Sequence, residues 1–163
     1  MSSAENQSIH DCDDPETMDR IHFPLQPDQD GYPPYGCETL WAKQVSQTHY
    51  ELDNIPFYIR GISAGALVSV KKYGNELHFN GLKQPSENST LRIIFFNDDH
   101  RQPLLDWLSN MGCSTEGHPP LIAINIPAAV DFARVIEHIA DHKHTDRWDY
   151  EEAAISASHK AQL

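Results

Sequence analysis

Cys113, Glu116 and His118 lie within six residues of one another, in a segment that Gly112 and Pro119 flank. A cysteine acts as a nucleophile when a base lies within hydrogen-bond distance of its thiol and a third group orients that base. The spacing alone does not supply this arrangement, because short cysteine patterns do not transfer between folds. We therefore interpret Cys113 as a half-buried structural residue beside a turn.

His138, His142 and His144 form a second cluster with metal-binding potential. His138 and His142 are four residues apart, so they share one face of a helix. A tetrahedral zinc site needs further ligands, for which Asp141 and Asp146 are the nearest candidates. Neither C-x-x-C nor H-E-x-x-H accompanies the histidines. We expect a solvated helix end here, with no metal and no cofactor.

Two other clusters are also better explained without chemistry. The stretch HDCDD at residues 10–14 resembles a metal trap, but it lies in a segment too polar to hold a fixed geometry. Asp98 and Asp99, next to His100, are explained as caps of a following helix. The sequence contains no phosphate loop, nucleophile elbow or dinucleotide fingerprint. We therefore predict that the chain is not an enzyme.

The net charge of −12 is unevenly distributed along the chain. Residues 1–36 carry eight acidic side chains and one basic one, whereas residues 37–136 carry ten acidic and eight basic ones. Nucleic-acid binding needs an excess of Lys and Arg, so we expect no nucleic-acid partner. No apolar run approaches the roughly 20 residues of a membrane helix. The N-terminus lacks a signal-peptide pattern and the cysteines are odd in number, so we expect a cytoplasmic protein with reduced thiols and no membrane partner.

The apolar pattern predicts an α+β fold. Strands are predicted over residues 38–45, 49–53, 57–59, 67–73, 76–79, 91–96 and 121–126, and helices over 98–111 and 128–142. We expect a bent antiparallel sheet or half-barrel, followed by a β-α-β-α unit with two helices on one side. Within that unit, the βαβ crossover over residues 91–126 should be right-handed. Arg92, in an otherwise apolar strand, should pair with an acid on a neighbouring strand.

The domain boundaries follow from composition. Residues 1–22 are predicted to be a mobile acidic segment, 23–152 a single α+β domain and 153–163 a C-terminal tail. Residues 23–36 contain four prolines and two glycines, which predicts an arm without a helix. Pro56 should end or bend a strand, because it lacks an amide hydrogen, and Phe57 should then fill the core.

Several short motifs are similar to those of a bacterial family of small domains known only as a domain of unknown function. They are ETLWA at 38–42, YELDNIPF at 50–57, STLR at 89–92 and GCSTEG at 112–117, and the similarity ends near WDYEE at 148–152. This chain departs from the pattern at Gly65-Ala66, where Gly-Asp is expected. The resemblance implies a shared fold and no established activity. By analogy of context, it suggests immunity proteins that accompany bacterial toxins.

Acidic residues held by a folded element are the best candidates for a partner-binding surface, because a mobile segment loses entropy when it binds. Aromatic side chains interleaved with acids are typical of interface anchors within a polar rim. The predicted surface therefore comprises Asp141, Asp146, Trp148, Asp149, Tyr150, Glu151 and Glu152, followed by Asp98, Asp99 and Glu116. The alternative is that Trp148 and Tyr150 pin the C-terminal segment to the core.

Three hypotheses about function remain open at this point. The first is a non-catalytic, immunity-type inhibitor that occupies the basic active-site groove of a cognate toxin. The second is a small-molecule-binding or enzymatic domain on the concave face of the sheet near Cys113 and His118. The third is an acidic surface that provides only solubility.

Overall fold

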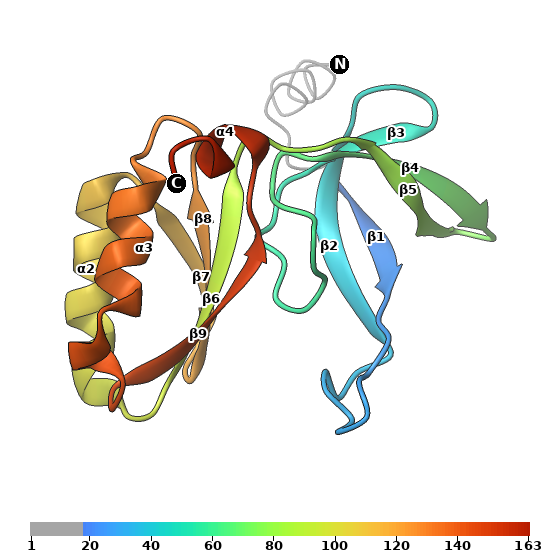
Figure 1. Ribbon diagram of the computed structural model, residues 1–163. Coiled ribbons are helices and arrows are strands. Elements are labelled where there is room, and N and C mark those ends of the chain that lie inside the picture. Colours follow the sequence, from blue (N-terminus) through green and yellow to red (C-terminus); the bar gives the residue numbers. More distant parts are fainter. Residues whose placement is uncertain (1–17) are drawn as a thin grey trace, which may run out of the picture.

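The computed structural model describes residues 18–163, which form two β-sheets from consecutive stretches of the chain (Figure 1). The predicted metal trap at residues 10–14 lies outside the described residues. The first sheet contains β1 (Met18–Pro24), β2 (Cys37–Gln44), β3 (His49–Leu52), β4 (Leu67–Tyr73) and β5 (Glu76–Gln84). The second contains β6 (Ser89–Phe95), β7 (Ser114–His118), β8 (Leu121–Ile126) and β9 (Trp148–Ala154).

The first sheet is a closed barrel in which each strand pairs with the next. All consecutive pairs are antiparallel, so the first and fifth strands point the same way, and β1 closes the barrel on β5 as a parallel pair. Ile21 and Phe23 of β1 are fully buried in the barrel core. The prediction that residues 18–22 are mobile was therefore wrong, because their alternate apolar side chains complete the barrel.

The second sheet has the strand order β7-β8-β6-β9, with antiparallel neighbours throughout. The 3-10 turn η2 (Asp98–His100) and α2 (Arg101–Met111) connect β6 to β7, and α3 (Phe132–Ala140) and the turn η3 (His142–His144) connect β8 to β9. Each helix therefore joins two parallel strands that are separated by a third. This is the β-α-β-β-α-β arrangement of ferredoxin-like folds.

The predicted parallel crossover over residues 91–126 was wrong, because β6 and β8 are antiparallel. The cause is β7, which forms a hairpin with β8 and reverses the chain direction. Its sequence, STEGH, has no apolar alternation, so the apolar pattern does not predict this strand.

The predicted α+β architecture with two helices on one side is confirmed (Figure 1). One face of α2 and one face of α3 pack on the sheet through buried side chains that include Leu108, Phe132, Val135 and Ile139. Gly112 ends α2 in the left-handed conformation, at φ 101°. Asn97, not Asp98 or Asp99, accepts the capping hydrogen bond at the start of η2. None of the helices in residues 18–163 is long and apolar enough to cross a membrane.

The segment assigned to a tail contains a final short helix, α4 (Ala157–Lys160), with a fully buried His159. The Ser156 N–H donates to Ser89 Oγ at 2.8 Å, and Ser89 Oγ lies 2.6 Å from His159 Nδ1. His159 Nε2 lies 3.1 Å from the Pro127 carbonyl, and its ring stacks on Phe132. This serine–histidine pair is sealed from solvent, so it anchors the C-terminus.

Candidate functional site

The loop between β3 and β4, residues 53–66, lies between the barrel and the second sheet (Figure 1). Pro56 does stand outside any strand, but residues 57–59 belong to the loop and not to a strand as predicted. Ile55 and Pro56 are buried, whereas Phe57 is only half-buried and lies outside both apolar cores. The prediction that Phe57 fills the core was wrong, because here the chain leaves the barrel wall and crosses to the other sheet.

Glu38, on β2, holds this loop from the barrel side. Its carboxylate accepts the backbone N–H groups of Phe57 at 2.6 Å, Tyr58 at 3.0 Å and Ile59 at 2.9 Å. Only 8% of Glu38 is exposed. Three N–H donors compensate the cost of burying its charge.

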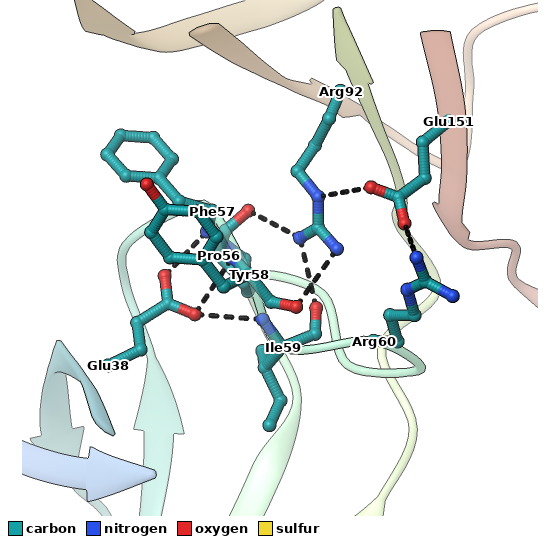
Figure 2. Close-up of polar contacts among 8 residues, drawn as sticks. All are labelled: Glu38, Pro56, Phe57, Tyr58, Ile59, Arg60, Arg92 and Glu151. Carbon is teal, nitrogen blue, oxygen red and sulfur yellow. Dashed lines mark hydrogen bonds and ion pairs between the residues drawn. The ribbon is translucent and has the colours of Figure 1, made fainter. Parts of the chain in front are cut away.

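Arg92, on β6, holds the same turn from the sheet side (Figure 2). Its guanidinium donates to the carbonyls of Pro56 at 3.1 Å, Tyr58 at 3.2 Å and Ile59 at 3.0 Å. Arg92 Nε also donates to Glu151 Oε1 at 3.1 Å, and so the predicted pairing with an acid on a neighbouring strand is confirmed.

Glu116, Ala123, Arg92 and Glu151 form one row across the four strands of the second sheet. At the β7 end, Glu116 accepts from the Ile55 N–H at 3.4 Å and from Asn54 Nδ2 at 3.5 Å. At the β9 end, Glu151 Oε2 forms an ion pair with Arg60 Nη2 at 2.6 Å. The loop therefore lies along this row. Burial raises the pKa of Glu116, although the N–H of Ile55 opposes the shift.

We call Glu38, Arg92, Glu116 and Glu151, with the loop residues that they hold, the loop clamp. Its charged groups bind backbone atoms or each other, which fixes the loop between the two sheets. Glu38, Arg92 and Glu116 stand in three of the motifs on which the family resemblance is based. Sequence reasoning missed Glu38, although its position two residues before Leu40 puts it on the inward face of β2.

The predicted cluster of Cys113, Glu116 and His118 is not assembled. Cys113 is buried in the core of the second sheet, and burial raises the pKa of its thiol to about 11. Glu116 contacts the loop, and His118 is exposed at the far end of β7. An extended chain of five residues spans about 16 Å, so Cys113 and His118 lie apart.

Only two of the three histidines near the end of α3 lie together, because the ring centroids of His138 and His144 are 5.2 Å apart whereas His142 points into solvent. The ring of His138 stacks on Trp107 and that of His144 on Trp148, whereas the side chain of His142 is 98% exposed. Burial lowers the pKa of both His138 and His144. Residues 18–163 contain no group of three side chains placed to bind a metal ion.

The predicted partner-binding residues fall into two groups. The members of the first group already contact other residues of this protein. Glu116 and Glu151 belong to the loop clamp, and Trp148 is buried, with Nε1 donating to the Ile139 carbonyl at 3.1 Å. Trp148 therefore pins β9 to the core, as the alternative interpretation predicted. Asp141 accepts from the Lys143 N–H, and Asp98 pairs with Arg101.

The second group lies on or beside β9, at one edge of the sheet. We call Asp146, Asp149, Tyr150 and Glu152, which are all exposed, the acidic edge. Asp98 and Asp99 lie near its start, because β6 ends where β9 begins and the Phe96 N–H donates to the Arg147 carbonyl at 2.9 Å. Phe96 is itself 56% exposed.

Comparison with known proteins supports the fold and the family. No curated protein matches the chain. One solved structure, described as a novel crystal structure of a hypothetical protein from Neisseria gonorrhoeae, is similar with a TM-score of 0.72 and 15% sequence identity. The match covers 84% of this chain and 94% of that one, which shows a shared fold. A family model matches residues 38–150, from Glu38 of the loop clamp to Tyr150 of the acidic edge. The chain therefore belongs to the family described as Domain of unknown function (DUF4265).

Proposed function

We propose that this protein is a non-catalytic protein-binding domain whose acidic edge binds a basic surface on a partner. The observation that carries the proposal is that three neighbouring carboxylates are exposed and form no ion pair within the described residues. Asp146, Asp149 and Glu152 are exposed, and none of them forms an ion pair with another residue in the range 18–163. They flank Tyr150, which is 37% exposed, along the chain, and this gives the mixture of charge and aromatic area typical of interfaces.

The partner that fits best is a cognate bacterial toxin with an electropositive active site, which makes the protein an immunity-type inhibitor. Enzymes that act on anions concentrate basic residues in their clefts, and an acidic edge gains complementarity and a fast on-rate there. Asp149 and Glu152 are held on a strand, so their placement costs little entropy on binding. Such an inhibitor acts in the cytoplasm of the cell that produces the toxin.

The test is to reverse the acidic edge without touching the loop clamp. Asp146, Asp149 and Glu152 are changed together to Lys, and association is measured with the purified product of the neighbouring gene, which the proposal requires to be a toxin. Glu151 is left intact, because it holds Arg92. A matched control changes three exposed acids outside the second sheet to Lys: Glu51 on β3, Glu76 on β5 and Glu87 between β5 and β6. Both variants change the net charge equally.

The proposal predicts that the acidic-edge variant associates at least about tenfold more slowly at low salt and loses protection of toxin-expressing cells. The control variant keeps most of both properties. If the two variants behave alike, net charge and not this edge determines binding. If the native chain neither binds the toxin nor protects cells, the inhibitor function is wrong.

A further inference from the structure

β9 is an edge strand with an open side. β9 pairs with β6 alone. Near the C-terminal end of β9, the Gly61 N–H donates to the Ala153 carbonyl at 2.9 Å. The Phe96 N–H donates to the Arg147 carbonyl, which makes these two residues a hydrogen-bonded pair of the antiparallel ladder. Such pairs alternate as far as Glu152, after which the register shifts, so Trp148, Tyr150 and Glu152 direct their backbone N–H groups away from β6.

The contact of Asp149 supports this orientation. Asp149 Oδ1 accepts the Tyr150 N–H at 2.9 Å, which places that N–H on the open side of the strand. Native proteins often protect exposed strand edges with charged side chains. The carboxylate belongs to the adjacent residue and is exposed, so another acceptor can replace it.

A depression lies on each side of this open strand. On the helix side, a hollow of about 230 Å³ is lined by residues that include Ile139, Asp141 and Trp148. On the barrel side, a hollow of about 170 Å³ is lined by residues that include Tyr32, Ile94 and Leu121. Asp149 and Tyr150 line both hollows. An added strand would point alternate side chains into the two hollows.

The two hollows differ in chemistry. The helix side offers the carboxylate of Asp141, and Glu152 lies on this side of β9 because it stands on the same face of the strand as Tyr150 and the buried Trp148. The barrel side offers apolar surface from Ile94 and Leu121 beside the ring of Tyr32. Of its three charged groups, Arg92 and Glu151 bind each other, and Asp149 accepts the Tyr150 N–H. The fitting strand therefore carries basic side chains on one face and apolar ones on the other.

We propose that the partner adds an extended segment, alternating basic and apolar residues, as an antiparallel strand on β9. This inference rests on the proposed function and specifies how the basic partner is bound. The added strand accepts the N–H of Tyr150 in place of the Asp149 carboxylate, and it also accepts the N–H of Glu152. Its basic side chains lie on the helix side and its apolar side chains on the barrel side.

The probe is a blocked synthetic peptide, TKVKVKT, added to the full-length protein. In a hydrogen-bonded antiparallel pair, opposite residues point to the same side, so the lysine N–H groups face β9 and the valine N–H groups face away. We expect the peptide to slow hydrogen exchange of the Tyr150 and Glu152 amides at least about tenfold. The same peptide N-methylated at its lysines should lose this protection. N-methylation at its valines should preserve it.

A variant tests the same contact from the protein side. Tyr150→Pro removes one outward N–H without removing a bond to β6, and proline is tolerated at strand edges. Tyr150→Ala keeps the N–H and serves as the control, and circular dichroism checks both folds. We expect Tyr150→Pro to weaken peptide binding at least about fivefold more than Tyr150→Ala.

The outcomes separate this inference from the proposed function. In one outcome, the toxin binds and reversal of the acidic edge weakens that binding, but the peptide does not protect β9 and Tyr150→Pro changes the binding of neither the toxin nor the peptide. Strand addition is then wrong and the proposed function stands. If the peptide protects β9 but the toxin does not bind, strand addition stands and the inhibitor function is wrong. Equal effects of the two N-methylated peptides overturn strand addition directly.

Discussion

Glu38 and Arg92 bind the same turn, Phe57 to Ile59, from opposite sides and through opposite backbone groups. Glu38 accepts the three N–H groups, and Arg92 donates to the carbonyls of Tyr58 and Ile59 (Figure 2). Glu38 belongs to the barrel and Arg92 to the second sheet. The turn therefore links the barrel to the second sheet through Glu38 and Arg92.

Replacing Arg92 should be costly, because its buried guanidinium, 3% exposed, satisfies three carbonyls and a carboxylate. We expect Arg92→Met to lower the free energy of unfolding by about 3–5 kcal/mol, the usual range for breaking a buried charged network. Arg101→Met is the control, since Arg101 pairs at the surface with Asp98 and should cost about 0–1 kcal/mol. Urea denaturation measures both. Equal losses would mean that the loop clamp does not stabilise the fold.

Replacing the smaller loop residue, Ile55, by alanine should lower the free energy of unfolding more than replacing the larger one, Phe57. Ile55 is 4% exposed, so Ile55→Ala should cost about 2–4 kcal/mol. Phe57 is half-buried outside both cores, so Phe57→Ala should cost only about 1–2 kcal/mol. Thermal and urea unfolding test the order. A larger loss of stability for Phe57→Ala than for Ile55→Ala would show that Phe57 belongs to the core.

His138 and His144 should make the fold sensitive to acid. Burial lowers the pKa of each from its ordinary value of 6.5, the charge of Lys143 lowers both further, and the charge of His138 also lowers the pKa of His144. The unfolded chain therefore binds protons at higher pH than the folded one. The stability that these histidines contribute is complete above pH 6.5 and is lost as the pH falls towards their folded values.

The test compares unfolding temperatures at pH 7.5 and pH 5.5. His144→Phe preserves an aromatic ring beside Trp148 and removes the titrating group. It should reduce the loss of stability between the two pH values. His142→Phe is the control, because the side chain of His142 is 98% exposed, and its loss should match that of the native chain. An unchanged loss in the His144→Phe variant would contradict the assignment.

The thiols of Cys37 and Cys113 should differ sharply in reactivity. Cys37 is exposed, whereas Cys113 is buried and has its pKa raised to about 11, so only about one in a thousand Cys113 thiols is ionised at pH 8. Iodoacetamide should therefore modify Cys37 long before Cys113, as peptide mass spectrometry can show. In line with a structural role, Cys113→Ser and His118→Ala should both preserve toxin protection. Rapid labelling of Cys113 in the folded protein would reopen the catalytic hypothesis.

The sequence predicted the parts of the fold that have strong apolar periodicity. The strand over residues 91–96, the strand over 121–126 and the helical stripe through Phe132, Val135 and Ile139 all stand where they were expected. The strands over residues 67–73 and 76–79 were also predicted, and Tyr73 pairs with Glu76 across the Gly74-Asn75 turn. In these elements local pattern and tertiary burial favour the same structure.

The elements that were missed obtain their stability from distant partners. β7 is polar, and only its pairing with β8 makes it a strand. β1 follows an acidic segment, and its role depends on closure against β5, more than 50 residues later. The sequence indicated only part of the loop clamp. Arg92 stood out in an apolar strand, but its carbonyl partners lie more than 30 residues away and no local pattern indicates them.

The order of the clamp residues along the chain has a consequence for biosynthesis. The barrel uses residues 18–84 and the second sheet residues 89–154, so the barrel leaves the ribosome first. During this time Glu38 is already available to the turn at Phe57 to Ile59, whereas Arg92, Glu116 and Glu151 are still unsynthesised. A nascent barrel can therefore form with half of its loop contacts, and translation of β9 supplies the last of them. Chains that terminate before Glu151 should consequently expose this loop to proteases and quality-control factors.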